Sequence, residues 1–136
     1  MKITDSQLKY MLPRNLDYVK WLDPLNTVLP KYEINTKNRI AAFIAQTAHE
    51  SLDYTRLVEN LNYSAKGLMS TWPSRFKTIE VANQYARQPE KIANYVYSGR
   101  LGNSANVAVG DGWKYRGRGI MQITGKENYL KCSITL

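Results

Sequence analysis

Apolar residues recur every three or four positions along several short stretches of this chain, a spacing typical of amphipathic helices. The clearest stretch begins at Thr36 and ends near Tyr54. Its apolar and small residues at this spacing are Ile40, Phe43, Ile44, Thr47 and Ala48. One face of this helix is therefore expected to lie against the core.

The first 35 residues show the start signals of short helices. Thr4 and Gln7 have the spacing of a capping box, which predicts a first helix, and a second helical stretch follows. Asp23 before Pro24 predicts an N-cap with proline at the first helical position. We expect these helices to serve as scaffold.

The second half of the chain predicts further short helices and one irregular region. Helices are expected over residues 64–72, 78–87 and 89–97. Residues 102–119 hold five of the eight glycines and are expected to form a loop with tight turns. Ile120 to Ile123 predict a short strand, and Thr124 with Glu127 predicts a second capping box that opens a last helix. The fold class is mainly α with a small β or irregular lobe.

The composition is that of one globular domain over residues 1–136. Lysine and arginine outnumber the acids 19 to 11, so the surface attracts polyanions. Nucleic acid, anionic lipids, and the acidic peptides and teichoic acids of bacterial walls all fit this charge. The lysines are scattered and also serve solubility, so the charge is only supporting information.

The start of the chain, MKITDSQLKYMLPRN, meets polar residues too early for a secretory signal. Cys132 is the single cysteine, so no internal disulfide can form. We expect a cytoplasmic protein.

Glu50 continues the apolar face of the helix that begins at Thr36, because seven residues from Phe43 make nearly two turns. Partial burial and the negative end of the helix dipole would favour its protonated form, which a general acid requires. The alternative is an ion pair with Arg56 or Lys114, and periodicity alone favours that alternative.

Glu59 follows nine residues later, in an aperiodic stretch that could return across a cleft toward Glu50. Paired carboxylates are the usual equipment of glycosidases. A separation of about 6.5–9.5 Å leaves room for a water and gives inversion, whereas about 5–5.5 Å gives retention. The alternative for Glu59 is an ordinary exposed loop acid.

Other chemistries find little support. His49 lacks the second histidine of an HExxH zinc site, because Asp53 stands at that position, and we expect no metal. No GxSxG elbow is present. The RGRG at residues 116–119 is a weak nucleic-acid signal, and we expect no nucleic-acid partner.

Three blocks of the sequence resemble glycoside hydrolase family 19, in particular its phage endolysin branch with a lysozyme-like fold. The blocks are AHESLDYTRLVENLNYSAKGL at residues 48–68, YARQPEKIANYVY at 85–97 and GDGWKYRGRGIMQITGKENY at 110–129. The resemblance extends from about residue 36 to 130.

The resemblance implies a role for each matching residue. Glu50 would be the general acid and Glu59 the general base, while Gln122 and Thr124 would hold the attacking water and line the cleft. The remaining sugar contacts and cleft-wall residues would be Tyr115, Arg118, Asn128 and Tyr129. Alternatively, Thr124 is a plain N-cap and Arg118 braces the acidic residues.

The reaction that the resemblance implies is an inverting, cofactor-free cleavage of a β-1,4 bond between N-acetylmuramic acid and N-acetylglucosamine. Chitin is the alternative polymer, but the NYSA and ARQPEKIAN segments are more like those of endolysins, which favours peptidoglycan. A non-catalytic cationic protein that binds the wall or membrane is a further alternative.

Family catalytic domains continue beyond the QIT segment with further helices, whereas this chain stops at Leu136. We therefore expect a truncated domain with reduced activity and a tendency to self-associate. The protein would act on the wall from the host cytoplasm after release through a holin-type pore.

Overall fold

The computed structural model describes residues 1–136 as a mainly helical chain, which confirms the predicted fold class. The chain forms two compact units. Unit 1 comprises residues 1–57 and 119–121, and unit 2 comprises residues 58–118 and 122–136. The β structure amounts to two isolated antiparallel bridges, Val58 with Arg118 and Arg118 with Ile123. That residues 1–136 act as one catalytic domain stays a prediction.

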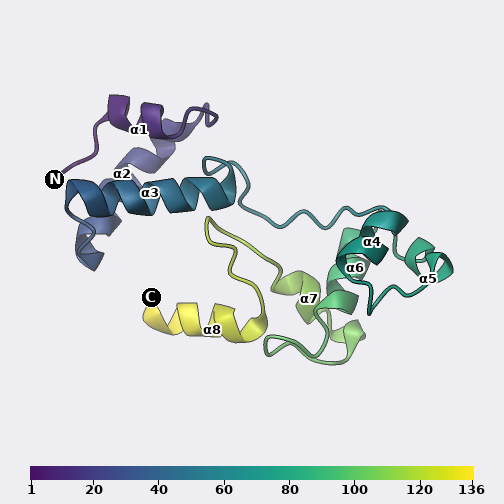
Figure 1. Ribbon diagram of the computed structural model, residues 1–136. Coiled ribbons are helices and arrows are strands. Elements are labelled where there is room, and N and C mark those ends of the chain that lie inside the picture. The colour runs from purple at the N-terminus through teal and green to yellow at the C-terminus, as the bar shows by residue number, and fades with distance from the viewer. The chain divides into compact units, whose positions relative to one another are not determined.

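Unit 1 is built on its longest helix, α3 (Lys37–Ser51). The other elements are α1 (Asp5–Met11), the 3-10 helix η1 (Tyr18–Trp21), α2 (Leu22–Val28) and the 3-10 helix η2 (Leu29–Tyr32). Figure 1 shows α1 and α2 beside α3. Their apolar faces share one core of Ile3, Leu8, Leu12, Leu25, Leu29, Ile40, Ile44, Ala48 and Tyr54.

Two of the three helix starts predicted in unit 1 are confirmed. The Thr4–Gln7 capping box is present, and Thr36 caps α3 by accepting from the Arg39 N–H. The prediction for Asp23 is wrong. Because η1 runs into α2 without an extended residue between them, α2 starts at Leu22 and Asp23 lies in its first turn.

The helix predicted to end near Tyr54 ends at Ser51. Leu52, Asp53 and Tyr54 have φ angles of 50°, 56° and 64°, the left-handed region that non-glycine residues rarely adopt. Buried contacts offset this strain: the Asp53 carboxylate binds Arg14, and the Tyr54 and Thr47 hydroxyls are 2.6 Å apart. The chain is thereby turned sharply at the end of α3.

Unit 2 contains the helices predicted over residues 64–97 and two short helical elements, η3 and α7, that were not predicted. Its elements are α4 (Ala65–Thr71), α5 (Ile79–Asn83), α6 (Pro89–Val96), the 3-10 helix η3 (Val107–Val109), α7 (Asp111–Lys114) and α8 (Lys126–Thr135). Its core consists of Leu61, Leu68, Phe76, Ala82, Ile92, Ala93 and Val96. The unpredicted α7 lies in the glycine-rich region, where Gly112 packs against α6 so closely that a Cβ would lie 2.1 Å from the Ala93 carbonyl oxygen.

The strand predicted over Ile120–Ile123 is wrong. Residues 119–122 form a turn, and only Ile123 pairs, with Arg118. The apolar character of Ile120 is instead explained by its packing against the core of unit 1.

The capping box predicted at Thr124 and Glu127 is also wrong. The N-cap of α8 is Gly125, and no side chain of its own helix caps it. The preceding loop performs this function, since the Lys126 N–H donates to Asn103 Oδ1 at 2.9 Å and the Glu127 N–H donates to the Leu101 carbonyl oxygen at 3.1 Å.

Helix α8 buries none of its residues, and Leu130 and Ile134 are exposed on it. Self-association of the chain stays a prediction. No helix combines the length and the apolar character required to span a membrane.

Candidate active site

Glu50 lies in the last turn of α3 and is exposed, which corrects the expectation of partial burial. The face of α3 that the core covers carries Ile44, Thr47, Ala48 and Ser51, and Glu50 falls outside it. Its Oε1 accepts a hydrogen bond of 2.8 Å from Gln46 Nε2, one turn earlier. No ion pair joins it to Arg56. The carboxylate is therefore open to solvent and oriented by one amide.

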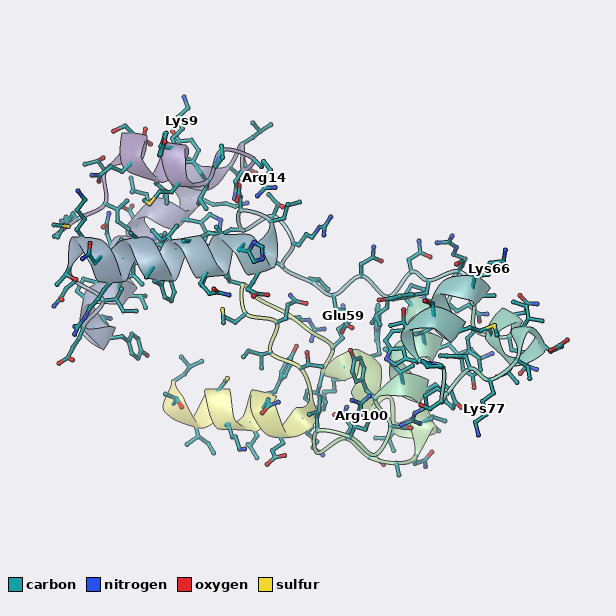
Figure 2. All side chains as sticks on the ribbon, in the orientation of Figure 1. Lys9, Arg14, Glu59, Lys66, Lys77 and Arg100 are labelled. Atoms are coloured by element: carbon teal, nitrogen blue, oxygen red, sulfur yellow. The ribbon has the colours of Figure 1, made fainter.

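Glu59 lies in the irregular segment between α3 and α4, and its side chain is half-buried in unit 2 (Figure 2). Its backbone is held by the glycine-rich loop: the Glu59 N–H donates to the Gly117 carbonyl oxygen at 2.8 Å, and Val58 bridges to Arg118. Glu59 is therefore an anchored residue and not an ordinary loop acid.

Both oxygens of the Glu59 carboxylate accept a hydrogen bond. The Tyr97 hydroxyl donates to Oε1 at 2.6 Å, and the Gly117 N–H donates to Oε2 at 3.3 Å. Burial, followed by the bond to Glu59, raises the pKa of Tyr97 well above its ordinary value, so the hydroxyl stays a donor. A carboxylate oriented in this way is suited to accept a proton from water.

Gly117 brings two further predicted residues to Glu59. A Cβ at Gly117 would lie 2.8 Å from Gln122 Oε1, 3.1 Å from Thr124 Oγ1 and 3.2 Å from Glu59 Cβ. The three side chains thus surround the position that a Cβ of residue 117 would take, and a side chain there would displace them. Gln122 and Thr124, which the sequence predicts at the water site, lie next to the predicted base.

The other predicted residues form a second group beside this one. The rings of Tyr115 and Tyr129 meet edge to face at 5.3 Å. Arg118 Nη1 donates to the Tyr129 hydroxyl at 2.9 Å and to the Lys114 carbonyl oxygen at 2.7 Å, so it braces this wall and not a glutamate. Asn128 Nδ2 donates to the Thr124 carbonyl oxygen at 2.9 Å, which ties the start of α8 to the first group.

The structure therefore gathers most of the predicted site in one unit. Unit 2 holds Glu59, Tyr115, Arg118, Gln122, Thr124, Asn128 and Tyr129, while Glu50 belongs to unit 1. Sequence reasoning did not single out Tyr97 and Gly117. Their signals were present, since Tyr97 ends the YARQPEKIANYVY block and Gly117 is the first glycine of RGRG.

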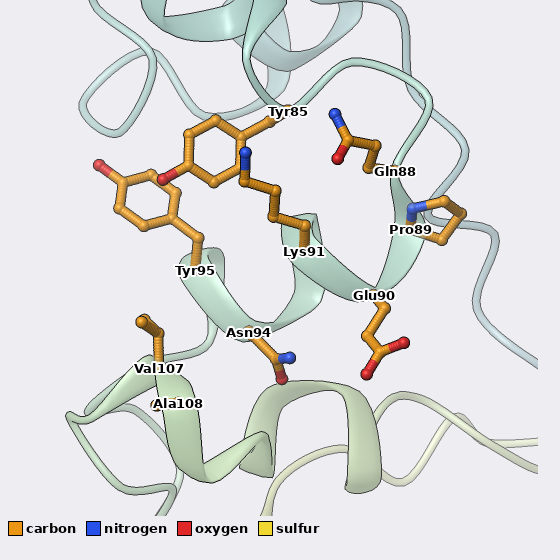
Figure 3. A pocket seen from close by; sticks show the side chains of 9 residues that line it. All are labelled: Tyr85, Gln88, Pro89, Glu90, Lys91, Asn94, Tyr95, Val107 and Ala108. Carbon is orange, nitrogen blue, oxygen red and sulfur yellow. The ribbon is translucent and has the colours of Figure 1, made fainter.

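A separate hollow of unit 2 lies between α6 and η3, with a volume of about 540 Å³ (Figure 3). None of the predicted site residues lines it. Its polar groups are largely used within the fold: Lys91 Nζ donates to the Gln84 carbonyl oxygen and lies over the Tyr85 ring, and Asn94 Oδ1 accepts from the Trp113 N–H. This hollow is distinct from the surroundings of Glu59.

The chain is similar in sequence to a known protein. No family model matches the chain. Over 93 residues it is 53% identical to a protein of Haemophilus influenzae named a glycosyl hydrolase family 19 domain-containing protein. The chain belongs to glycosyl hydrolase family 19. The match takes in 68% of this chain and 46% of the relative, so the chain spans about half the length of this family 19 protein.

Proposed function

We propose that this family 19 chain is an endolysin-type peptidoglycan hydrolase that cleaves the β-1,4 bond between N-acetylmuramic acid and N-acetylglucosamine. The observation that carries the proposal is the environment of Glu59. Its carboxylate is oriented by Tyr97 and Gly117 and flanked by Gln122 and Thr124. This arrangement suits a base that activates water beside a bound sugar.

The proposed reaction is a single displacement with inversion. Glu50 donates its proton to the glycosidic oxygen as the bond from that oxygen to the anomeric carbon breaks. Water bonds to the anomeric carbon from the opposite face, and its proton passes to Glu59. Gln122 and Thr124 hold the water by their polar side chains. The sugar contacts are Tyr115, Arg118, Asn128 and Tyr129.

Peptidoglycan is the preferred polymer in this proposal because of charge. The chain carries a net charge of +8. Peptidoglycan bears acidic peptides, whereas chitin is uncharged, so a basic surface concentrates the protein only on the former.

Release of reducing ends from purified peptidoglycan and from chitin oligomers, measured side by side, tests the proposal. We expect faster release from peptidoglycan. Faster cleavage of chitin would contradict the substrate assignment. Equal lysis of bacteria by the Glu50→Gln protein would instead support a non-catalytic, cationic wall-binding protein.

A further inference from the structure

A groove of unit 1 runs between the end of α1 and the last turns of α3, with a volume of about 1030 Å³. Its rim carries three basic side chains: Lys9 from α1, Arg14 from the loop after it, and His49 from α3. Figure 2 shows Lys9 on α1 and Arg14 on the loop that follows. All of these residues belong to unit 1.

These basic side chains keep donors for a ligand. Lys9 and His49 make no side-chain hydrogen bond and no ion pair. Arg14 uses Nε and Nη2 on the Asp53 carboxylate, which leaves Nη1 and a side chain that is 61% exposed. Since Arg14 already compensates Asp53, the groove keeps a positive charge. The helix dipole of α1 favours a basic residue such as Lys9 in the last turn. It does not explain why Arg14 and His49 line the same groove.

The rest of the groove is suited to more than a bare ion. Its lining includes the small side chains of Ala45 and Ala48 and the flexible Met11, with the 87% exposed Tyr10 beside them. Such a surface accepts short apolar side chains in van der Waals contact. An extended peptide of small apolar and acidic residues matches both the basic rim and the apolar lining. A phosphodiester polymer would pair with the basic rim but would leave the apolar lining without a partner.

The groove lies on a different face of α3 from Glu50. At about 100° per residue, Glu50 lies about 140° around the helix from Ala45, about 160° from Ala48 and about 100° from His49. A ligand in the groove would therefore occupy a part of the polymer that is not being cut.

We propose that this groove binds the acidic peptides of peptidoglycan through their carboxylates, and so holds the enzyme on its polymer. The proposal rests on the proposed function, because it assumes that peptidoglycan is the substrate. It adds a peptide-binding site to a glycan-cutting enzyme.

Dissociation constants for purified peptidoglycan test this site in the Glu59→Gln background, which prevents digestion during the measurement. We expect Lys9→Gln combined with His49→Gln to weaken binding about three- to tenfold, the size of one exposed charged contact and one hydrogen bond. The matched control is Lys77→Gln, another exposed lysine without an ion pair or side-chain hydrogen bond. Its binding should equal that of the parent.

Two further ligands sharpen the test. The Lys9/His49 double variant and its Glu59→Gln parent should bind two peptide-free polymers equally. These are peptidoglycan stripped of its peptides by an amidase, and chitin oligomers. The free dipeptide Ala-Glu should displace peptidoglycan at lower concentration than inorganic phosphate at the same ionic strength. Better displacement by phosphate would overturn the carboxylate assignment.

The outcome for the groove is separable from that for the reaction. An equal loss of affinity in the Lys9/His49 double variant and the Lys77 variant, or unchanged affinity in both, would overturn the proposal that the groove binds peptides. This holds even if the protein with Glu59 intact releases reducing ends from peptidoglycan. Absent hydrolysis combined with binding that depends on Lys9 would leave the groove in place and overturn the proposed reaction.

Discussion

Glu59 owes its orientation to two neighbours that carry no charge. Tyr97 comes from the end of α6 and Gly117 from the loop after α7, so one carboxylate joins two separate elements of unit 2. Neither residue bears the chemistry itself. Their contribution is to hold the carboxylate in one conformation, and activity is expected to depend on it.

Tyr97→Phe removes the donor to Glu59 Oε1 and leaves the ring in place. A hydrogen bond to a charged acceptor contributes about 1.5–3 kcal/mol, so we expect the kcat for peptidoglycan to fall about ten- to a hundredfold. The free energy of unfolding should fall by no more than about 1.5–3 kcal/mol, the contribution of the same hydrogen bond. Unchanged kcat would show that Tyr97 does not position the base.

Gly117→Ala places a methyl group against Gln122, Thr124 and Glu59. We expect a loss of about 1–3 kcal/mol in the free energy of unfolding and a loss of most activity, because all three side chains must shift. Gly119→Ala is the matched control. A Cβ there has no neighbour within 4 Å, but its φ of 85° costs a side chain about 1–2 kcal/mol. That protein should be less stable yet keep its kcat; equal losses of kcat in both would argue against crowding of the site.

At the scale of elements, the two ends that matter are the end of α3 and the start of α8, and both are held by residues distant in the sequence. Arg14 holds the left-handed turn after α3, and Asn103 caps α8 while donating to the Tyr97 carbonyl oxygen. Glu50 and Tyr129 are therefore positioned by tertiary contacts as well as by their own helices.

The Arg14–Asp53 pair predicts a pH dependence of stability. Hydrogen bonding by Arg14 lowers the pKa of the buried Asp53 carboxyl despite the opposing effect of burial. A lowered pKa gives stabilisation that is complete above the unfolded-state value of about 3.9 and is lost as the pH falls through the lower, folded-state value. Asp53→Asn should therefore unfold more easily at neutral pH and show a shallower loss of stability in acid. Parallel curves for the two proteins in chemical denaturation would contradict this role.

Asn103→Ala removes the cap of α8 and the bond to Tyr97, and should lower the free energy of unfolding by about 1–3 kcal/mol. Thr124→Ala, at the position where the sequence predicted the cap, should cost less than about 1 kcal/mol, because Thr124 makes no capping bond. Denaturant unfolding of the two variants compares them directly. A larger loss of stability in Thr124→Ala than in Asn103→Ala would show that Thr124 caps the helix.

The errors in the predicted elements share a physical cause. Periodicity and local caps predicted α1, α3, α4, α5 and α6, because these helices are decided by residues within one or two turns. Ile120 and Thr124 were misassigned because their environment comes from other parts of the chain: the core of unit 1 for Ile120, and Asn103 in place of a local cap for Thr124. Likewise, the partners of Glu59 are 38 and 58 residues away and leave no local pattern.

At the scale of the whole molecule, the predicted carboxylates belong to different units. Glu50 is carried by the helix on which unit 1 is built, and Glu59 by the loop network of unit 2. The hydrogen bonds of each side chain come from its own unit. The roles of acid and base are therefore testable one at a time.

The most direct test of the account is the initial rate of reducing-end release from purified peptidoglycan by the parent, Glu50→Gln and Glu59→Gln proteins, with the first anomer formed identified by NMR. We predict that the parent forms the inverted anomer, that each variant loses at least about a hundredfold in rate, and that the Glu50→Gln protein unfolds no more easily than the parent. Hydrolysis at the parental rate by either variant, or retention of configuration in the product, would contradict the account.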